Sequence, residues 1–178
     1  PGAVPRQAVA VDDAIEPVEL QAGNLLLRPF VPADADAVFE ACQDAEIQRW
    51  TTVPVPYTRA DAEEFVAACA ERWASGNPTF ACVDADSGDL LAAVDLQGCG
   101  AEEGPMVGFW VAPEARGQGV AVRAVQRVAR WAFDDLSLPR IRWAAYAGNV
   151  PSRRVADGAG FVREGTCRRA LEQRGQRH

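Results

Sequence analysis

The stretch on which the fold depends is Val107-Gly-Phe-Trp-Val-Ala-Pro-Glu-Ala-Arg116-Gly117-Gln118-Gly119-Val-Ala121. Residues 106–111 are rich in β-formers and predict a strand, and residues 117 to about 135 repeat apolar side chains at helical spacing. A helix N-terminus offers unpaired N–H groups and the positive end of its dipole, and glycines let an anion approach closely. With Arg116 alongside, this junction suits a pyrophosphate, although a plain loop-to-helix junction explains the glycines equally well.

Two other nucleotide-binding motifs fit this junction less well. The dinucleotide fingerprint needs a third small residue, where Val122 stands, and an acidic residue after the next strand, whereas Asp134 and Asp135 close a helix. A nucleotide P-loop needs a Lys, and all 18 basic residues of this chain are Arg. The absence of Lys also excludes a Schiff base and a lysine nucleophile.

The composition indicates one globular domain with an acidic surface. The 178 residues are enough to bury a core, and 48% are hydrophobic against 24% charged. A net charge of −7 and a pI of about 4.8 repel phosphate backbones, so no nucleic-acid partner is expected. The same charge weakly favours a cationic partner such as an amine.

Histidine and cysteine usage limits the chemistry further. The only histidine is His178, so a His-based triad and a zinc site are not expected, and we predict no metal. The five cysteines lack CxxC spacing, which indicates small buried thiols in a reducing cytoplasm. No apolar run reaches the roughly 20 residues of a membrane span, and no basic-then-apolar start suggests a signal peptide. We therefore expect a cytoplasmic protein with no membrane partner.

Hydrophobic periodicity predicts a mixed α/β (α+β) fold with a central sheet covered by helices. Strands are expected at residues 25–27, 80–83, 90–96, 106–111, 141–146 and 161–167, and helices at 34–43, 60–74, 117–135 and 151–159. Residues 1–17 are interpreted as a loose N-terminal extension, 18–170 as one domain, and 171–178 as a C-terminal tail.

A second cluster, Asn149-Val-Pro-Ser152-Arg-Arg-Val-Ala156-Asp-Gly-Ala-Gly160-Phe161, follows the strand expected at 141–146. Asn149 is a natural helix cap and Pro151 fits the first turn, so each residue alone has a local explanation. The ordered pair of clusters with a strand between them is far more specific than either one.

These clusters belong to an ordered set of motifs, between residues 25 and 169, that resembles the GCN5-related N-acetyltransferase (GNAT) superfamily. The motifs are Leu25-Leu-Leu-Arg28-Pro29, Trp50 with Pro56-Tyr57-Thr58, Gly108-Phe-Trp110, Arg116-Gly-Gln-Gly-Val-Ala121, Asn149 with Ser152, Gly160-Phe161 and Glu164-Gly165. The chain looks most like the branch of ribosomal-protein N-terminal acetyltransferases. The resemblance implies a mixed, mostly antiparallel twisted sheet with splayed strands, flanked by helices.

The resemblance implies acetyl-CoA, or another acyl-CoA, as cosubstrate. Its pyrophosphate would lie at Arg116, Gly117, Gln118, Gly119, Val120 and Ala121. Phe109, Trp110 and Val111 would pair with the pantetheine arm, on a strand that splays from residues 141–145. Asn149 would contact the cofactor or an ordered water near it, and Ser152 would lie near the thioester sulfur.

The implied chemistry is direct attack of a neutral amine on the thioester in a ternary complex. Ser152 is the candidate acid for the leaving thiolate, because Ala156 stands where many relatives carry a Tyr. Tyr146 is a reserve acid, or else a rim or core tyrosine. Relatives often have a Glu where Met106 stands. Asp95 is therefore the candidate base, with a strand-edge carboxylate as the alternative.

The acceptor is expected to be a primary amine, with Trp50 and Tyr57 lining its side of the cleft. The resemblance favours a protein N-terminus and leaves an aminoglycoside or a polyamine open. Two further alternatives remain, a non-catalytic acyl-CoA-binding or regulatory module and a transferase of a larger acyl group. A homodimer is compatible with all of them.

Overall fold

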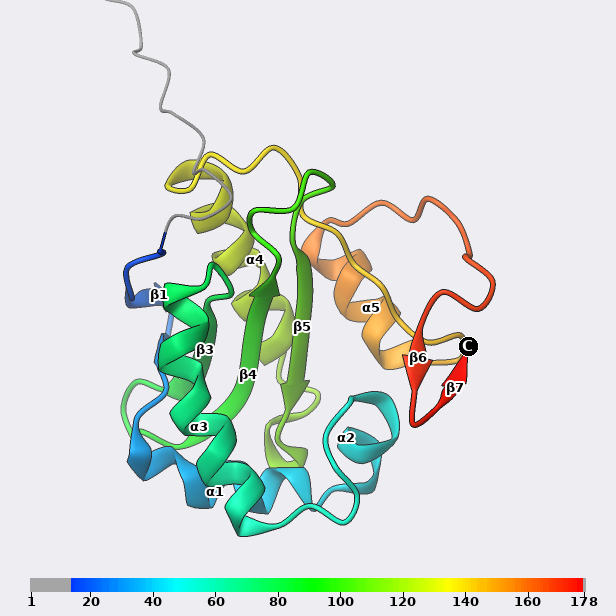
Figure 1. Ribbon diagram of the computed structural model, residues 1–178. Coiled ribbons are helices and arrows are strands. Elements are labelled where there is room, and N and C mark those ends of the chain that lie inside the picture. The colour runs from blue at the N-terminus through cyan, green and yellow to red at the C-terminus, as the bar shows by residue number, and fades with distance from the viewer. Residues whose placement is uncertain (1–13, 178) are drawn as a thin grey trace, which may run out of the picture.

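Helices cover both faces of a twisted five-stranded sheet in the computed structural model, which describes residues 14–177 (Figure 1). The strands lie in chain order and each neighbouring pair is antiparallel. They are β1 (Leu20–Ala22), β2 (Leu25–Pro29), β3 (Thr79–Asp84), β4 (Leu90–Gln97) and β5 (Met106–Val111).

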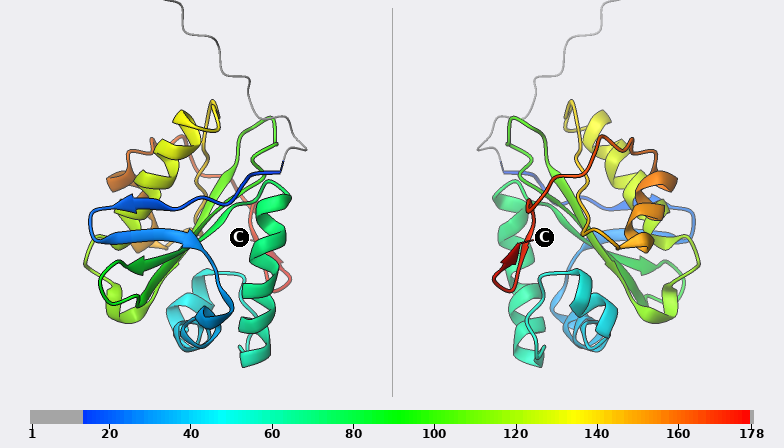
Figure 2. Two further views of the ribbon diagram at one scale, coloured as in Figure 1. Left: turned by 90° about the vertical axis from the view of Figure 1, so that its left-hand side faces the viewer. Right: turned by 90° about the vertical axis from the view of Figure 1, so that its right-hand side faces the viewer.

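The helices divide between the two faces of the sheet (Figure 2). One face is covered by α1 (Ala35–Cys42) and α3 (Arg59–Ala74), and the other by α4 (Val120–Asp134) with α5 (Val150–Ala159) beside it. The remaining short elements are α2 (Ala45–Trp50), the 3-10 turns Pro32–Asp34 and Pro113–Ala115, and the hairpin of β6 (Glu172–Gln173) and β7 (Gln176–Arg177). The predicted fold class is confirmed.

Aromatic packing joins α3 and α4 to the sheet. The rings of Trp73, Phe80 and Trp131 have centroids 4.8 to 6.0 Å apart, and all three are almost completely buried. The α4 residues expected on the inner face, including Val125 and Val128, lie in the same core. Burial of such side chains contributes about 1.5–3 kcal/mol each relative to exposure, so this core holds the cleft elements in a fixed frame.

Two of the expected strands are wrong. Residues 141–146 pair with β5 only at the bridge between Met106 and Arg142, and then leave it. The Trp143 ring packs between Phe109 and Phe161, at 5.2 Å from each ring centroid, so side-chain packing holds this segment instead of backbone pairing. Residues 161–167 form no strand either, because they bury little surface; Val162 is 85% exposed. The sequence analysis also missed the short strands β1, β6 and β7 and the short helix α2.

The cysteines follow the prediction with one exception. Cys42, Cys69, Cys82 and Cys99 are buried free thiols. Cys167 is exposed, contrary to expectation, because it lies in the segment that does not join the sheet.

The terminal segments differ in how much the structure describes. Residues 1–13 of the predicted N-terminal extension lie outside the described residues. Ile15 is buried, and its N–H donates to the Trp73 carbonyl at 3.1 Å. Near the C-terminus, Gln173 donates to the carbonyls of Arg49 and Thr51, so the β6–β7 hairpin contacts the end of α2. Each helix within residues 14–177 is too short or too polar to cross a membrane.

Candidate active site

A cleft of about 1060 Å³ opens where β5 and residues 143–146 diverge. Its walls come from α2, α3, β4, β5, the loop before α4, and the start of α5. Most residues predicted for the site therefore line one cavity, although they lie on segments far apart in the sequence.

The loop before α4 forms one end of this cleft from its backbone. Gly117 and Gly119 have φ of 75° and 72°, in the left-handed region that favours glycine, and Gly119 is the N-cap of α4. Within residues 14–177, the N–H groups of residues 117–122 have no backbone or side-chain acceptor. A Cβ built at either glycine would meet nothing within 4 Å, so space remains above these donors. This combination can bind an anion.

Arg116 forms an ion pair with the acidic residue that caps α2. Its guanidinium bonds both carboxylate oxygens of Asp44, at 2.5 and 3.3 Å. That interaction, ahead of the backbone bond from Ile47, holds the pKa of Asp44 below its ordinary value. Asp44 is also the N-cap of α2, so the anion loop is tied to the helix that carries Trp50.

The outer edge of β5 is open beside the cleft. Val107 donates to the Arg142 carbonyl at 3.0 Å, and among the described residues no later backbone bond joins β5 to residues 143–146. Phe109, Trp110 and Val111 are partly exposed on this stretch and line the cleft. Such an edge can pair with an extended amide-containing ligand.

Asn149 and Ser152 lie together at the start of α5. The Asn149 side chain caps the helix by accepting from the Ser152 N–H at 3.1 Å, and the residue is 8% exposed. The Ser152 Oγ accepts from the Trp143 Nε1 at 3.3 Å, which leaves its own hydroxyl proton available for donation into the cleft. Ala156 supplies no proton donor.

Asp95 lies in the middle of β4, facing the cleft. Gln97 donates to both of its carboxylate oxygens, at 3.1 and 3.3 Å, and the Arg72 guanidinium is 3.6 Å away. Burial raises the pKa of this carboxyl, while Gln97, Arg72 and the Gly108 N–H oppose that rise. Burial therefore makes this carboxylate more basic than an exposed one, and its polar contacts allow it to remain ionised.

The aromatic candidates occupy different depths. Trp50 is partly exposed, lines the cleft and donates from Nε1 to Glu46 at 2.9 Å. Tyr57 also contributes to the cleft wall, but it is 6% exposed and its ring belongs to the core between α1 and α3. The Tyr146 hydroxyl donates to the Glu172 carbonyl at 3.3 Å, so its proton is already engaged.

Sequence reasoning missed Arg72, Asp44 and Trp143. Each acts through a contact across many residues, for which the local sequence holds no signal. Gln97 had a signal, because it is in phase with Asp95 on the predicted strand. Within residues 14–177 no group of three or more His, Cys, Asp or Glu side chains could hold a metal ion.

The chain resembles known acetyltransferases over most of its length. Residues 24–162 match the family described as "Acetyltransferase (GNAT) domain". The Bacillus subtilis protein named "Putative ribosomal N-acetyltransferase YdaF" is 36% identical over 72 residues, covering 40% of this chain and 39% of the relative. A second B. subtilis relative, "Probable N-acetyltransferase YjcK", is 33% identical, covering 43% of this chain and 42% of its own length. The chain thus spans about two-fifths of the length of these curated relatives.

Solved structures agree with the fold. The ribosomal-protein-S5-alanine acetyltransferase of Vibrio fischeri superposes with a TM-score of 0.75 at 21% identity, covering 86% of this chain and 88% of the other. Mycobacterium smegmatis RimJ, solved in complex with CoA-disulfide, gives a TM-score of 0.75 at 24% identity, covering 92% and 82%.

Proposed function

The chain belongs to the acetyltransferase (GNAT) domain family, and from that premise we propose that it moves an acetyl group from acetyl-CoA to a primary amine. The observation that supports this proposal is that one cleft contains an open backbone anion site, an open strand edge and a largely buried carboxylate. Each of these features matches one part of the required chemistry.

The cofactor end is supported by the geometry of the loop before α4. The N–H groups of residues 117–122 and the dipole of α4 suit the two negative phosphates of CoA, and Gly117 and Gly119 leave room for them. The β5 edge at Phe109–Val111 suits the amides of a pantetheine arm. Bound acetyl-CoA supplies the thioester that the amine attacks.

The proton transfers follow from two side chains. Asp95 accepts the proton that the amine loses as its nitrogen bonds the acetyl carbon. Ser152 donates its hydroxyl proton to the sulfur as the carbon–sulfur bond breaks and regains a proton from water, while Asp95 releases one to water. Asn149 keeps Ser152 at the helix start. Tyr146 is the less favoured acid, because its hydroxyl already donates to Glu172.

The acceptor we propose is a protein or peptide N-terminus in the cytoplasm, with Trp50 against its first residues. Relatives named as ribosomal N-acetyltransferases support this choice, and the net charge of −7 favours a cationic amine. Ala156 and Met106 stand where many GNAT enzymes carry acid–base residues, which is the observation in favour of a non-catalytic acyl-CoA-binding module.

The test is release of free thiol from acetyl-CoA with N-terminal peptides, aminoglycosides and polyamines as acceptors. We expect thiol release with peptides, and a loss of about 10²–10⁴-fold in Asp95→Asn with CoA affinity retained. Calorimetric binding of CoA without thiol release from any amine would establish the non-catalytic module. Reaction with aminoglycosides alone would overturn the peptide assignment, and reaction with longer acyl-CoA alone would overturn acetyl.

A further inference from the structure

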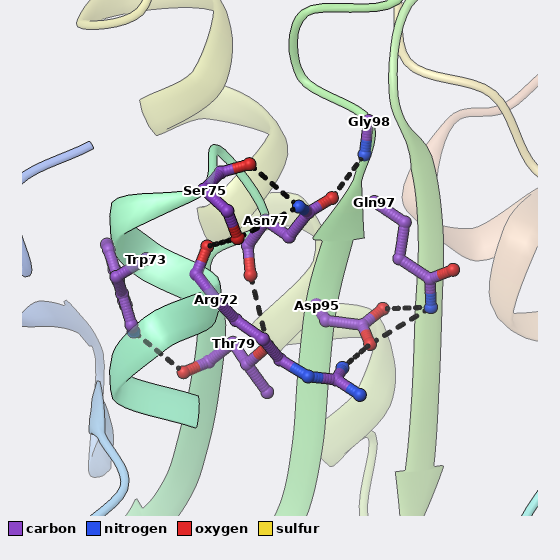
Figure 3. Close-up of polar contacts among 8 residues, drawn as sticks. All are labelled: Arg72, Trp73, Ser75, Asn77, Thr79, Asp95, Gln97 and Gly98. Carbon is purple, nitrogen blue, oxygen red and sulfur yellow. Dashed lines mark hydrogen bonds and ion pairs between the residues drawn. The ribbon is translucent and has the colours of Figure 1, made fainter. Parts of the chain in front are cut away.

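The Asp95 carboxylate, which lines the cleft, contacts Gln97 and Arg72 (Figure 3). Gln97, two residues along the same strand, donates from one Nε2 to both oxygens, which fixes the plane of the carboxylate. Arg72 approaches from α3 with its Nη1 3.6 Å from Oδ2. The role of Asp95 as a proton acceptor does not by itself require either contact.

Arg72 is held above Asp95 by the turn that follows α3. Its carbonyl accepts from the Asn77 N–H at 2.7 Å, and the Asn77 Oδ1 accepts from the Gly98 N–H at 2.7 Å, just beyond the end of β4 (Figure 3). Ser75 adds a bond from its hydroxyl to the same Arg72 carbonyl at 3.2 Å. The end of α3 and the end of β4 are therefore tied together, which fixes the backbone from which the Arg72 side chain reaches Asp95.

Gly108 makes room for the carboxylate on the other side. It is the register partner of Asp95 on β5. A Cβ at Gly108 would lie 2.4 Å from Oδ1 of Asp95 and 3.3 Å from Nε2 of Gln97. Any other residue would therefore displace the carboxylate from its present orientation.

The titratable side chains that face Asp95 come from α3. Arg72 on α3 is the cation, and Cys69 on the same helix is a buried thiol whose pKa is raised to about 12, so it stays neutral. Thr79 on β3 and Gly108 on β5, the register partners of Asp95, carry no charge. Burial disfavours the ionised form of Asp95, so Arg72 and Gln97 are what keep it charged.

We propose that Arg72, Gln97 and Gly108 are positioning residues that hold the Asp95 carboxylate ionised and turned toward the acceptor amine. This inference rests on the proposed function, in which Asp95 accepts the amine proton. The molecule offers a contrast in Arg28 and Asp34, which form a two-bond pair at 2.8 Å. A pair that tight strongly favours the ionised carboxylate over the protonated one, whereas the 3.6 Å approach of Arg72 supports the charge and leaves the oxygens able to accept a proton.

The first experiment measures the pH profile of kcat/KM in Arg72→Met and Arg72→Lys. We expect the acidic limb in Arg72→Met to move up by about one pH unit, with about 10-fold loss on that limb and recovery at high pH. Arg72→Lys should restore most of the profile. Arg130→Met, on the exposed side of α4, is the matched control and should leave the profile unchanged. An equal loss at every pH in Arg72→Met would show a merely structural role and overturn the inference.

A second experiment uses Gly108 in a double-mutant cycle. We expect Gly108→Ala to lower turnover about 10-fold in the native chain, and to cost nothing further in an Asp95→Ala background. Because Gly108 lies on β5, the strand proposed to contact the cofactor, CoA affinity is measured by calorimetry as a control. Full additivity of the two substitutions in turnover would contradict a role through Asp95.

Carboxyl NMR titration separates this inference from the proposed function. An Asp95 pKa that is unchanged in Arg72→Met overturns the inference, whatever the activity. Full turnover in Asp95→Asn overturns the assignment of Asp95 as base, and the proposed function fails at that residue. A raised NMR pKa in Arg72→Met together with a matching shift of the acidic limb supports both.

Discussion

The two ends of the cleft are built from different parts of the chain. At the anion end, residues 116–122 are contiguous and present backbone N–H groups shaped by two left-handed glycines. At the acceptor end, Asp95 depends on Arg72 and Gln97, and on the absence of a side chain at Gly108. The first end is therefore sensitive to backbone conformation and the second to individual side-chain groups, and substitutions should separate the two.

The largest expected effect comes from breaking the backbone end. Gly117→Val and Gly119→Val should weaken CoA binding by at least about 10²-fold, because each side chain fills the space above the N–H groups. Each also costs about 1–2 kcal/mol of stability for a left-handed backbone. Isothermal calorimetry measures the affinity and thermal unfolding the stability.

Gly88→Val is the matched control for that strain. Gly88 lies in the β3–β4 turn, has φ of 79°, and has open space around it in the same way. It should lose similar stability and keep CoA affinity. Native CoA affinity in the Gly117 and Gly119 variants would refute the anion site.

The next effect tests a side chain where the two ends meet. Ser152→Ala should lower turnover by up to about 10²-fold with little change in CoA affinity, since it removes one acid. Trp143→Phe keeps an aromatic ring but removes the donor to the Ser152 Oγ, so a smaller loss is expected. Steady-state kinetics with calorimetry gives both values, and full turnover in Ser152→Ala would move the acid role to Tyr146 or water.

The difference between the ends also explains what the sequence could predict. The strand, glycines and helix around residues 106–135 are local signals, so this end of the cleft and its central strands were predictable. Asn149 and Ser152 were also predictable, because a capping residue and its target are three positions apart. The resemblance to the family supplied their order and implied their roles.

The errors arose where packing across the chain decides the conformation. Residues 141–146 have the composition of a strand, yet they pair with β5 at one bridge alone, and the packing of the Trp143 ring against Phe109 and Phe161 holds them beside it. Tyr57, expected at the acceptor site, lines the cleft, but packing across the chain also buries most of the residue in the core, which its local sequence does not reveal. Burial raises its pKa above the ordinary value, ahead of the effect of Cys42. No periodicity in a single segment reveals such contacts.

A third and smaller effect tests the acceptor end of the cleft. Trp50→Leu should raise the KM for a peptide acceptor about 10-fold and leave CoA affinity unchanged, because the indole covers the cleft wall and bonds Glu46. Phe133→Leu, at an exposed position on α4 outside the cleft lining, is the control for loss of a surface aromatic. A change in CoA affinity as large as the change in KM would show that Trp50 does not belong to the acceptor end alone.

The smallest expected effect concerns the contact that joins the two ends. Asp44→Asn keeps the cap of α2, because Asn accepts from the Ile47 N–H as Asp does, but it removes the charge that holds Arg116. Release of Arg116 toward the phosphates should tighten CoA binding by about 2- to 5-fold, since partly exposed ion pairs contribute about 0.2–1 kcal/mol. Asp36→Asn, which breaks the ion pair between Asp36 on α1 and Arg59 on α3, outside the cleft lining, is the matched charge control in calorimetry. Weaker CoA binding in Asp44→Asn would mean that the pair orients Arg116 for the phosphates and does not compete with them. In that case the anion end would depend on a side chain from α2, and the two ends would be less independent than their construction indicates.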